Sequence, residues 1–196
     1  MARVAEAIGM VQVDYSTVDR VRAEHGPRWT AREGFVLSRT LFVARAVVDA
    51  LDAVPVLNAS WHADDTGVVR HRSVDLGVDG VVVAGADTQR LRGIGRMLAA
   101  RTGLDRPRPT FTLEAGAAEL CTPALVSPAV ATLGVGAVTR RPAVVALDDA
   151  SSGVGVRPIG ALTLVYDRRA VGTTEASRFL HTVRGALEAR DWAAEL

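Results

Sequence analysis

The sequence of 196 residues predicts an α/β fold: a two-layer sandwich in which helices pack against a mixed sheet. Three long segments repeat apolar residues at helical spacing. Between them lie short segments that alternate apolar and polar residues and that end at turn residues. The length suits one compact core, so we expect residues 1–196 to form a single domain, without an internal repeat or a linker.

The N-terminal part is predicted to form a strand followed by a short helix. Val11 to Asp14 alternates as a strand does. Ser16 fits a helix cap, and Asp19, three residues later, completes a capping-box pattern. This helix is expected to run through His25 and to stop at Gly26-Pro27.

The remaining elements follow from the same periodicities. The predicted long helices are Phe35 to Ala53, Asp87 or Thr88 to Arg101, and about Thr174 to Glu188. The predicted strands are Leu57 to His62, Val68 to His71, Ser73 to Val78, Gly80 to Ala84, Thr110 to Leu113, Val130 to Val135, Ala143 to Leu147, Gly155 to Ile159 and Ala161 to Tyr166. Gly134 and Gly136 lie inside a predicted strand, which indicates a close approach of another backbone segment.

Composition excludes several classes of function. The net charge is +1, so the charge balance favours neither a nucleic acid nor a membrane surface as partner. All 23 basic residues are arginine, so no lysine can form a Schiff base. The single Cys121 excludes an intrachain disulfide and disfavours a cysteine-based metal site. No apolar run is long enough to cross a bilayer and no secretory signal opens the chain, so we expect a cytoplasmic protein.

Short motifs spread over nearly the whole chain resemble one known family. They are Arg32-Glu33-Gly34-Phe35-Val36-Leu37, Pro55-Val56-Leu57-Asn58-Ala59-Ser60, Val74-Asp75-Leu76-Gly77-Val78, Ala86-Asp87, Thr110-Phe111-Thr112-Leu113, Ala131 to Ala137 and Arg141-Pro142. The pattern resembles the catalytic domain of the 2-oxoacid dehydrogenase dihydrolipoamide acyltransferases, which shares its fold with chloramphenicol acetyltransferase. The chain carries no segment resembling that family's lipoyl or subunit-binding domain, so we expect a stand-alone catalytic-type domain.

The family's catalytic motif is altered at the residues that do the chemistry. The family writes Asp-His-Arg-x-x-Asp-Gly, and this chain has residues 167–173 in that place, with Arg168 at the histidine and Gly172 at the second aspartate. In the family the histidine is the general base. A guanidinium has no lone pair to offer and stays protonated, so it cannot take that role. Glu114 stands where the family has a serine or threonine that stabilises the oxyanion.

The resemblance implies a homotrimer whose active site lies in a channel between subunits. Coenzyme A enters that channel in the family, and it is the one cofactor that the resemblance implies here. No particular residue of this chain is identified as its ligand. Arg168 and Glu114 of the adjacent protomer should then face each other, as the two residues that we place in the catalytic position. The residues expected to line the site are Tyr166, Asp167, Arg169, Gly172 and Cys121.

Three functions remain open for such a site. A repurposed pocket could use the carboxylate as a base and the guanidinium to hold an anionic group, for proton abstraction, elimination or cyclisation of a small molecule in specialised metabolism. An interfacial ion pair could instead close an inactive scaffold, which would serve as the partner subunit of an active paralogue. Residual acyl transfer would need another base.

The four histidines do not add a second motif. His62 and His71 flank Asp64-Asp65, which is expected to be an exposed turn and not a metal site. His25 is expected at a helix end and His181 on a solvent-facing helix surface. Asp167 and Arg169 are expected to fix the turn through local hydrogen bonds.

Overall fold

A computed structural model describes residues 5–62, 66–101, 108–146 and 151–196 of the chain. Its strands are β1 (Glu6–Asp14), β2 (Ala59–Trp61), β3 (Val68–Arg70), β4 (Leu76–Val78), β5 (Val81–Val83), β6 (Phe111–Ala115), β7 (Ala131–Val135), β8 (Thr139–Ala146) and β9 (Ser152–Asp167). Its helices are α1 (Ser16–Glu33), α2 (Arg39–Ala53), α3 (Leu91–Ala99) and α4 (Thr173–Ala189), with short 3₁₀ turns η1 (Pro55–Leu57), η2 (Ala86–Thr88) and η3 (Ala193–Glu195).

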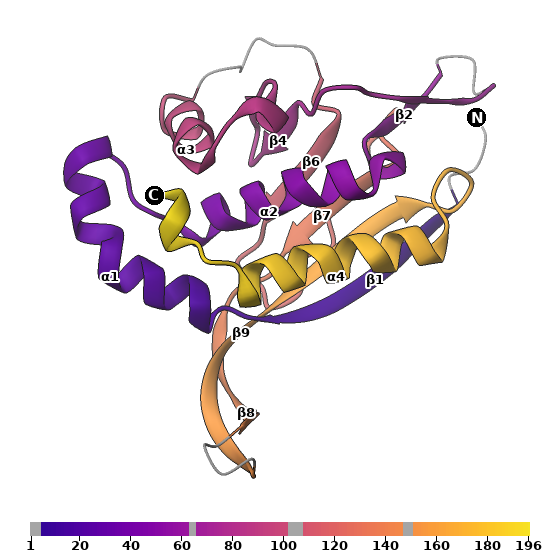
Figure 1. The fold of residues 1–196 in the computed structure, drawn as a ribbon. Coiled ribbons are helices and arrows are strands. Elements are labelled where there is room, and N and C mark those ends of the chain that lie inside the picture. The colour runs from indigo at the N-terminus through magenta and orange to yellow at the C-terminus, as the bar shows by residue number, and fades with distance from the viewer. Residues whose placement is uncertain (1–4, 63–65, 102–107, 147–150) are drawn as a thin grey trace.

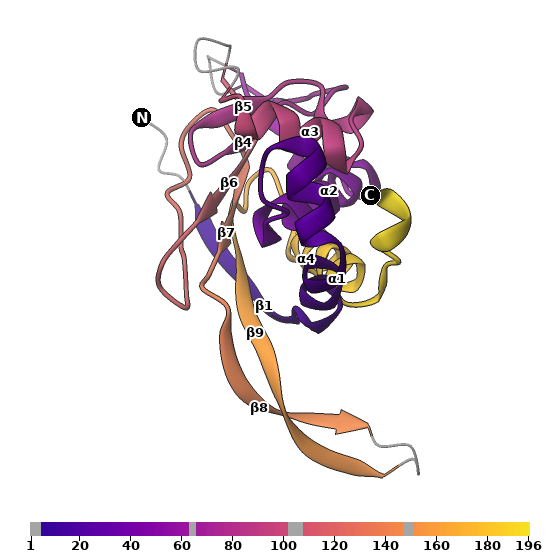
Figure 2. The same ribbon diagram turned by 90° about the vertical axis from the view of Figure 1, so that its left-hand side faces the viewer.

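The predicted mixed sheet and helical layer are confirmed. The main sheet has the order β1-β9-β7-β6-β4-β5, with β8 paired to the N-terminal part of β9. The strands β4, β6 and β7 are parallel to one another, and the other pairs are antiparallel. All four α-helices cover one face of this sheet (Figures 1 and 2). The β8–β9 ribbon extends away from the body (Figure 2).

The core lies between the helices and the sheet. The largest contribution from one helix comes from α2, in which nine of fifteen residues are buried. Its apolar side chains meet α4, where Phe179, Leu180 and Val183 face inward at helical spacing. Buried residues extend along α4 from Ala176 to Leu187, so the helix is packed over most of its length.

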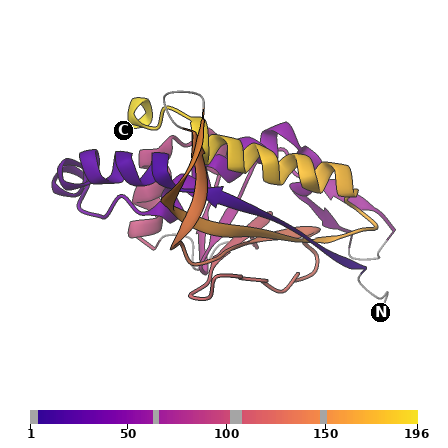
Figure 3. The ribbon, with the colours of Figure 1, turned by 90° about the horizontal axis from the view of Figure 1, so that it is seen from below.

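The opposite face of the sheet is partly covered by the connection between β6 and β7, which passes beneath the strands in Figure 3. A side chain at Gly134 would collide with the carbonyl oxygen of Cys121, and one at Gly136 with that of Glu119. The close backbone approach predicted from the two glycines is therefore confirmed.

The predicted end of the first helix is wrong. The helix α1 continues through Gly26 and Pro27 and ends at Gly34, which adopts a left-handed conformation with φ of 80°. Pro27 removes one backbone donor, but Trp29 beyond it is 3% exposed and packs edge-on against Phe35. Burial of this aromatic ring offsets the missing hydrogen bond. Local sequence rules do not include such tertiary burial, so they end the helix too early.

The predicted capping box is also wrong. Ser16 does not cap α1; its backbone N–H and its hydroxyl both donate to Asp14 Oδ1, at 2.8 and 2.5 Å. Asp19 binds Arg39 through both carboxylate oxygens, at 2.8 and 2.6 Å. The carboxylate that accepts the backbone N–H of Ser16 at the start of the helix therefore belongs to Asp14, which precedes Ser16, and not to Asp19, which follows it.

The starts of two further helices differ from prediction. The helix α2 begins at Arg39 and not at Phe35, because Ser38 accepts a hydrogen bond from the Leu41 N–H and caps it. The predicted helix from Asp87 or Thr88 begins only at Leu91, because η2 precedes it and Asp87 accepts from the Val74 N–H instead.

The last two predicted strands form the single strand β9, which passes through Gly160 without a break. A ring carbon of Tyr15 lies 3.0 Å from the position that a side chain at Gly160 would occupy. The glycine therefore makes room for this buried ring and does not end the strand. The predicted turn at Asp64-Asp65 and the end of the predicted strand at Leu147 lie outside the described residues.

Candidate functional site

The turn between β9 and α4 is held by one buried carboxylate. Asp167 is 1% exposed and accepts hydrogen bonds from the Arg169 N–H (3.0 Å), Arg169 Nη2 (2.6 Å) and the indole Nε1 of Trp61 (3.1 Å). Burial alone would raise the pKa of Asp167, but the hydrogen bonds and charge of Arg169 outweigh it and hold the pKa below its usual value. The turn is therefore rigid, with an ionised aspartate at its base.

This rigid turn presents Arg168 to solvent. The Arg168 N–H donates to the carbonyl of Ala5, and the Val171 N–H donates to that of Asp167, so the backbone makes one helix-like turn. Arg168 is exposed, and its guanidinium makes no ion pair with the described residues. Gly172, four residues later, is the N-cap residue of α4. A side chain at Gly172 would meet the carboxylate of Glu175, which folds back over it.

Glu114 lies near the opposite end of the sheet. It is exposed in β6, and no described cation pairs with its carboxylate. The Cys121 thiol donates to the backbone carbonyl of Glu114 across 3.6 Å. Burial and, second, the charge of Glu114 raise the pKa of this thiol. Cys121 is thus a neutral neighbour of Glu114 at ordinary pH and not a thiolate nucleophile.

The sheet register shows how far apart Arg168 and Glu114 lie within one protomer. Glu114 pairs with Gly134, which pairs in turn with Thr163 on β9. Arg168 follows Thr163 by five residues, which is roughly 17 Å along the strand. The two side chains therefore cannot form one site inside a single chain, and any meeting between them requires a second copy.

Two other residues predicted to line the site, Tyr166 and Arg169, differ in how far they are buried. Tyr166 is 3% exposed and belongs to the hydrophobic core, so its ring points into the protomer. Arg169 is half-exposed, and its guanidinium lies over the Trp61 ring at 4.5 Å from the ring centroid. No local pattern in the sequence indicates that Trp61 contacts this turn, because β2 is remote from the turn in the chain.

One polar pair was missed by sequence reasoning. The Ser60 hydroxyl lies 2.8 Å from His71 Nε2, because β2 and β3 form a two-stranded hairpin. Asn58, which follows η1, accepts from the His71 N–H at 2.9 Å and donates from Nδ2 to the His71 carbonyl at 3.3 Å. Within the described residues, no group of three or more His, Cys, Asp or Glu side chains could hold a metal ion. No described helix is long and apolar enough to cross a membrane.

Solved structures share this architecture of a helical layer on a mixed sheet. A protein from Listeria monocytogenes, reported as a probable dihydrolipoamide acetyltransferase, is 25% identical, with a TM-score of 0.83 over 96% of this chain and 87% of that one. The Azotobacter vinelandii dihydrolipoamide acetyltransferase is 19% identical, with a TM-score of 0.79 over 95% of this chain and 83% of that one. A chloramphenicol acetyltransferase aligns with a TM-score of 0.60 at 14% identity, over 94% of this chain and 86% of that one. The fold is that of these acyltransferases.

Sequence comparison narrows the fold to a family. The family model for 2-oxoacid dehydrogenases acyltransferase (catalytic domain) matches residues 1–85 and 114–194, and this chain belongs to that family. The acetyltransferase component of the pyruvate dehydrogenase complex of Mycobacterium bovis is 34% identical over 94% of this chain. The chain spans 37% of the length of that relative.

Proposed function

We propose that this domain has lost the histidine-dependent acyl transfer of its family and uses the altered site on a small anionic molecule. The observation that carries the proposal is the state of the two substituted residues. Arg168 and Glu114 are both exposed, and neither has an ion-pair partner among the described residues. A rigid turn aims Arg168 outward, and no histidine donates to or accepts from this turn in the described structure.

The two side chains suit acid–base chemistry of a different kind. Arg168 can hold a carboxylate, an enolate or an acyl oxygen through paired hydrogen bonds. Glu114 of the adjacent protomer can accept a proton from the carbon or heteroatom next to that group. Proton abstraction, elimination or cyclisation of a small metabolite in specialised metabolism fits this arrangement.

The proposal requires assembly, and we propose a homotrimer with the site in the channel between protomers. The separation of roughly 17 Å along one protomer supports a site shared between copies. Ile8 and Met10 are 62% and 53% exposed on the sheet face away from α4, and Leu120 is 52% exposed on the segment beneath the sheet. Large exposed apolar side chains of this kind mark an interaction face. The same channel would admit coenzyme A if the family's cofactor is retained.

Enzyme-dependent consumption of small molecules tests the proposal. Purified protein is incubated with a metabolite extract of the producing organism, and the mixture is followed by mass spectrometry. We expect at least one small organic acid to be consumed by the wild type and spared by Glu114→Gln and by Arg168→Gln. Glu24→Gln, which removes an exposed carboxylate from α1, is the matched control and should leave consumption unchanged.

Identical profiles for the wild type and Glu114→Gln would refute the repurposed site. In that case, the inactive scaffold predicts that the two residues pair across the interface. A double-mutant cycle measures this alternative: the loss of trimer stability in Glu114→Gln and Arg168→Gln should then be smaller for the double variant than the sum of the two single losses. Co-purification with an acyltransferase that keeps the histidine would identify the partner subunit.

A further inference from the structure

A small cavity lies between α1 and the C-terminal segment, far from the altered motif. It has a volume of about 300 Å³ and is lined by His25, Arg28, Trp29, Arg32, Ala193 and Leu196. The four residues from α1 follow the spacing i, i+3, i+4, i+7, which places them on one face of the helix. Figure 1 shows the C-terminal turn beside α1. The C-terminal segment follows the end of α4, whereas the turn that carries Arg168 precedes its start. The 17 residues of α4 separate these two places by roughly 25 Å.

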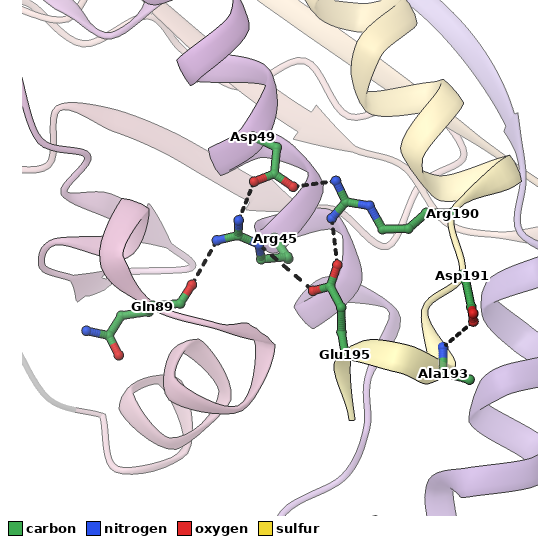
Figure 4. Close-up of polar contacts among 7 residues, drawn as sticks. All are labelled: Arg45, Asp49, Gln89, Arg190, Asp191, Ala193 and Glu195. Atoms are coloured by element: carbon green, nitrogen blue, oxygen red, sulfur yellow. Dashed lines mark hydrogen bonds and ion pairs between the residues drawn. The ribbon is translucent and has the colours of Figure 1, made fainter.

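The C-terminal wall of this cavity is fastened in place by a network of charged residues (Figure 4). Arg190 donates to Asp49 at 2.5 Å and to Glu195 at 2.9 Å, while Arg45 binds Asp49 and the carbonyl of Gln89. Trp192 is fully buried and packs edge-on against Phe42. The wall is therefore a fixed surface that can shape a binding site, and not a frayed end.

The cavity has an excess of positive charge. None of the side chains that line it is acidic, but His25 Nε2 lies 3.7 Å from the carboxylate of Glu24, and Arg92 donates to the main-chain oxygen of Leu196 at 3.1 Å. Arg28 is exposed and makes no ion pair with the described residues. Arg32 contacts the carboxylate of Glu33 at 3.1 Å, but Arg92 and Arg96 bind the same buried carboxylate at 3.1 and 2.8 Å. One negative charge is thus shared by three guanidinium groups, and the surroundings of the cavity retain net positive charge.

A buried donor without an acceptor lies at the same place. Trp29 is 3% exposed, and its indole Nε1–H has no hydrogen-bond partner in the described structure. The ring is held by an edge contact with Phe35 at 5.7 Å and by the Arg92 guanidinium at 5.9 Å, both measured to ring centroids. An unpaired buried donor of this kind costs free energy. Less than 1 Å² of this nitrogen is accessible, so an anion in the cavity would supply the missing acceptor after the side chains that cover the nitrogen move aside.

We propose that this cavity binds a phosphate group. Guanidinium forks match the oxygens of a tetrahedral phosphate, and Arg28 and Arg32 lie one helical turn apart at the cavity's edge. The indole N–H of Trp29 donates to a third oxygen, and His25 adds a further donor on the same helix face. The phosphate is either free in solution or part of a larger molecule such as a nucleotide-derived cofactor. The inference does not depend on the function proposed for Arg168 and Glu114.

Nuclear magnetic resonance of the indole N–H groups tests this site, because the chain has three tryptophans. Uniformly ¹⁵N-labelled full-length protein is titrated with inorganic phosphate at constant ionic strength. We expect a saturable shift of the Trp29 indole signal, while the signals of Trp61, which is bound to Asp167, and of Trp192 stay in place. Arg28→Gln should weaken the affinity at least about tenfold, as the loss of a charge-assisted hydrogen bond predicts.

Arg20→Gln is the matched control, since it removes an exposed cation of α1 that does not line the cavity. It should leave the titration unchanged. If Arg28→Gln does not fold, Arg32→Gln replaces it in the same comparison. Parallel titrations with coenzyme A and dephospho-coenzyme A assign the source: a response that needs the 3′-phosphate favours the cofactor, and equal responses to all three favour free phosphate. A shift that chloride reproduces, or one that survives both arginine substitutions, would overturn the proposal.

Discussion

The carboxylate of Asp167 should contribute more to stability than any exposed carboxylate in the chain, and Asp167→Asn measures this. The substitution keeps the size of the side chain but places an NH₂ group where Oδ2 stood. That oxygen accepts from Trp61 at 3.1 Å, from Arg169 Nη2 at 2.6 Å and from Arg169 Nε at 3.1 Å. Because Arg169 Nε also donates to Oδ1 at 3.0 Å, one neutral bond and one charge-assisted bond are lost outright. Such bonds contribute about 1 and about 1.5–3 kcal/mol. Arg169 is 32% exposed and regains water, which lowers the total.

We therefore expect Asp167→Asn to lose about 3 kcal/mol of unfolding free energy. For a chain of this size, that corresponds to a fall in Tm of roughly 6–12 °C by calorimetry at pH 7. Asp52→Asn, which alters an exposed residue of α2, is the control and should change stability by less than about 0.5 kcal/mol.

The pH dependence has a definite sign. The pKa of Asp167 is lower in the folded chain than in the unfolded one, so its contribution is complete above the unfolded pKa of about 3.9 and is lost as the pH falls through the folded value. The difference in Tm between the wild type and Asp167→Asn should therefore narrow below about pH 4. A variant that melts within about 1 °C of the wild type at pH 7 would refute the role given to this turn.

Three further predictions follow from packing and from the thiol. Gly134→Ala should lower Tm by several degrees, because the new methyl group meets the main chain of Cys121. By contrast, Gly185→Ala has free space in α4 and should raise stability by about 0.5–1 kcal/mol, and equal effects of the two substitutions would contradict the packing. Trp192→Ala should cost about 3–5 kcal/mol in urea unfolding, since its ring is fully buried; a loss below about 1 kcal/mol would show a frayed C-terminal segment. Iodoacetamide should modify Cys121 more slowly than a free cysteine at pH 7.5, because the pKa of its thiol is raised. Glu114→Gln should speed that reaction by removing a charge that raises this pKa. An unchanged rate in Glu114→Gln would contradict an electrostatic effect of Glu114 on the Cys121 thiol.

Much of the fold could be predicted because its elements obey local rules. The helical spacing of Phe179, Leu180 and Val183 indicates the inner face of α4. The central strand β7 is an uninterrupted buried segment. The second half of helix α1 could not be predicted, because Gly26-Pro27 ends a helix by local rules, and only the burial of Trp29 against Phe35 extends the helix beyond it.

The site was harder to predict than the fold. Arg168 and Glu114 were visible as substitutions only against the family pattern, and their separation along the sheet depends on a register that pairs distant segments. The contact between Trp61 and Asp167 spans 106 positions, so no local pattern could indicate it. The cavity beside α1 requires the C-terminal segment to fold back over that helix, which no spacing in the sequence encodes.

The most direct test of the central claim is the transfer of an acetyl group from acetyl-coenzyme A to dihydrolipoamide by the purified wild-type protein, followed as free coenzyme A by chromatography. Because the guanidinium of Arg168 stays protonated, we expect no release above that of a sample without enzyme between pH 6 and 9. A rate that rises with protein concentration, saturates with both substrates and survives Arg168→Gln would contradict the account, because another residue would then be supplying the base.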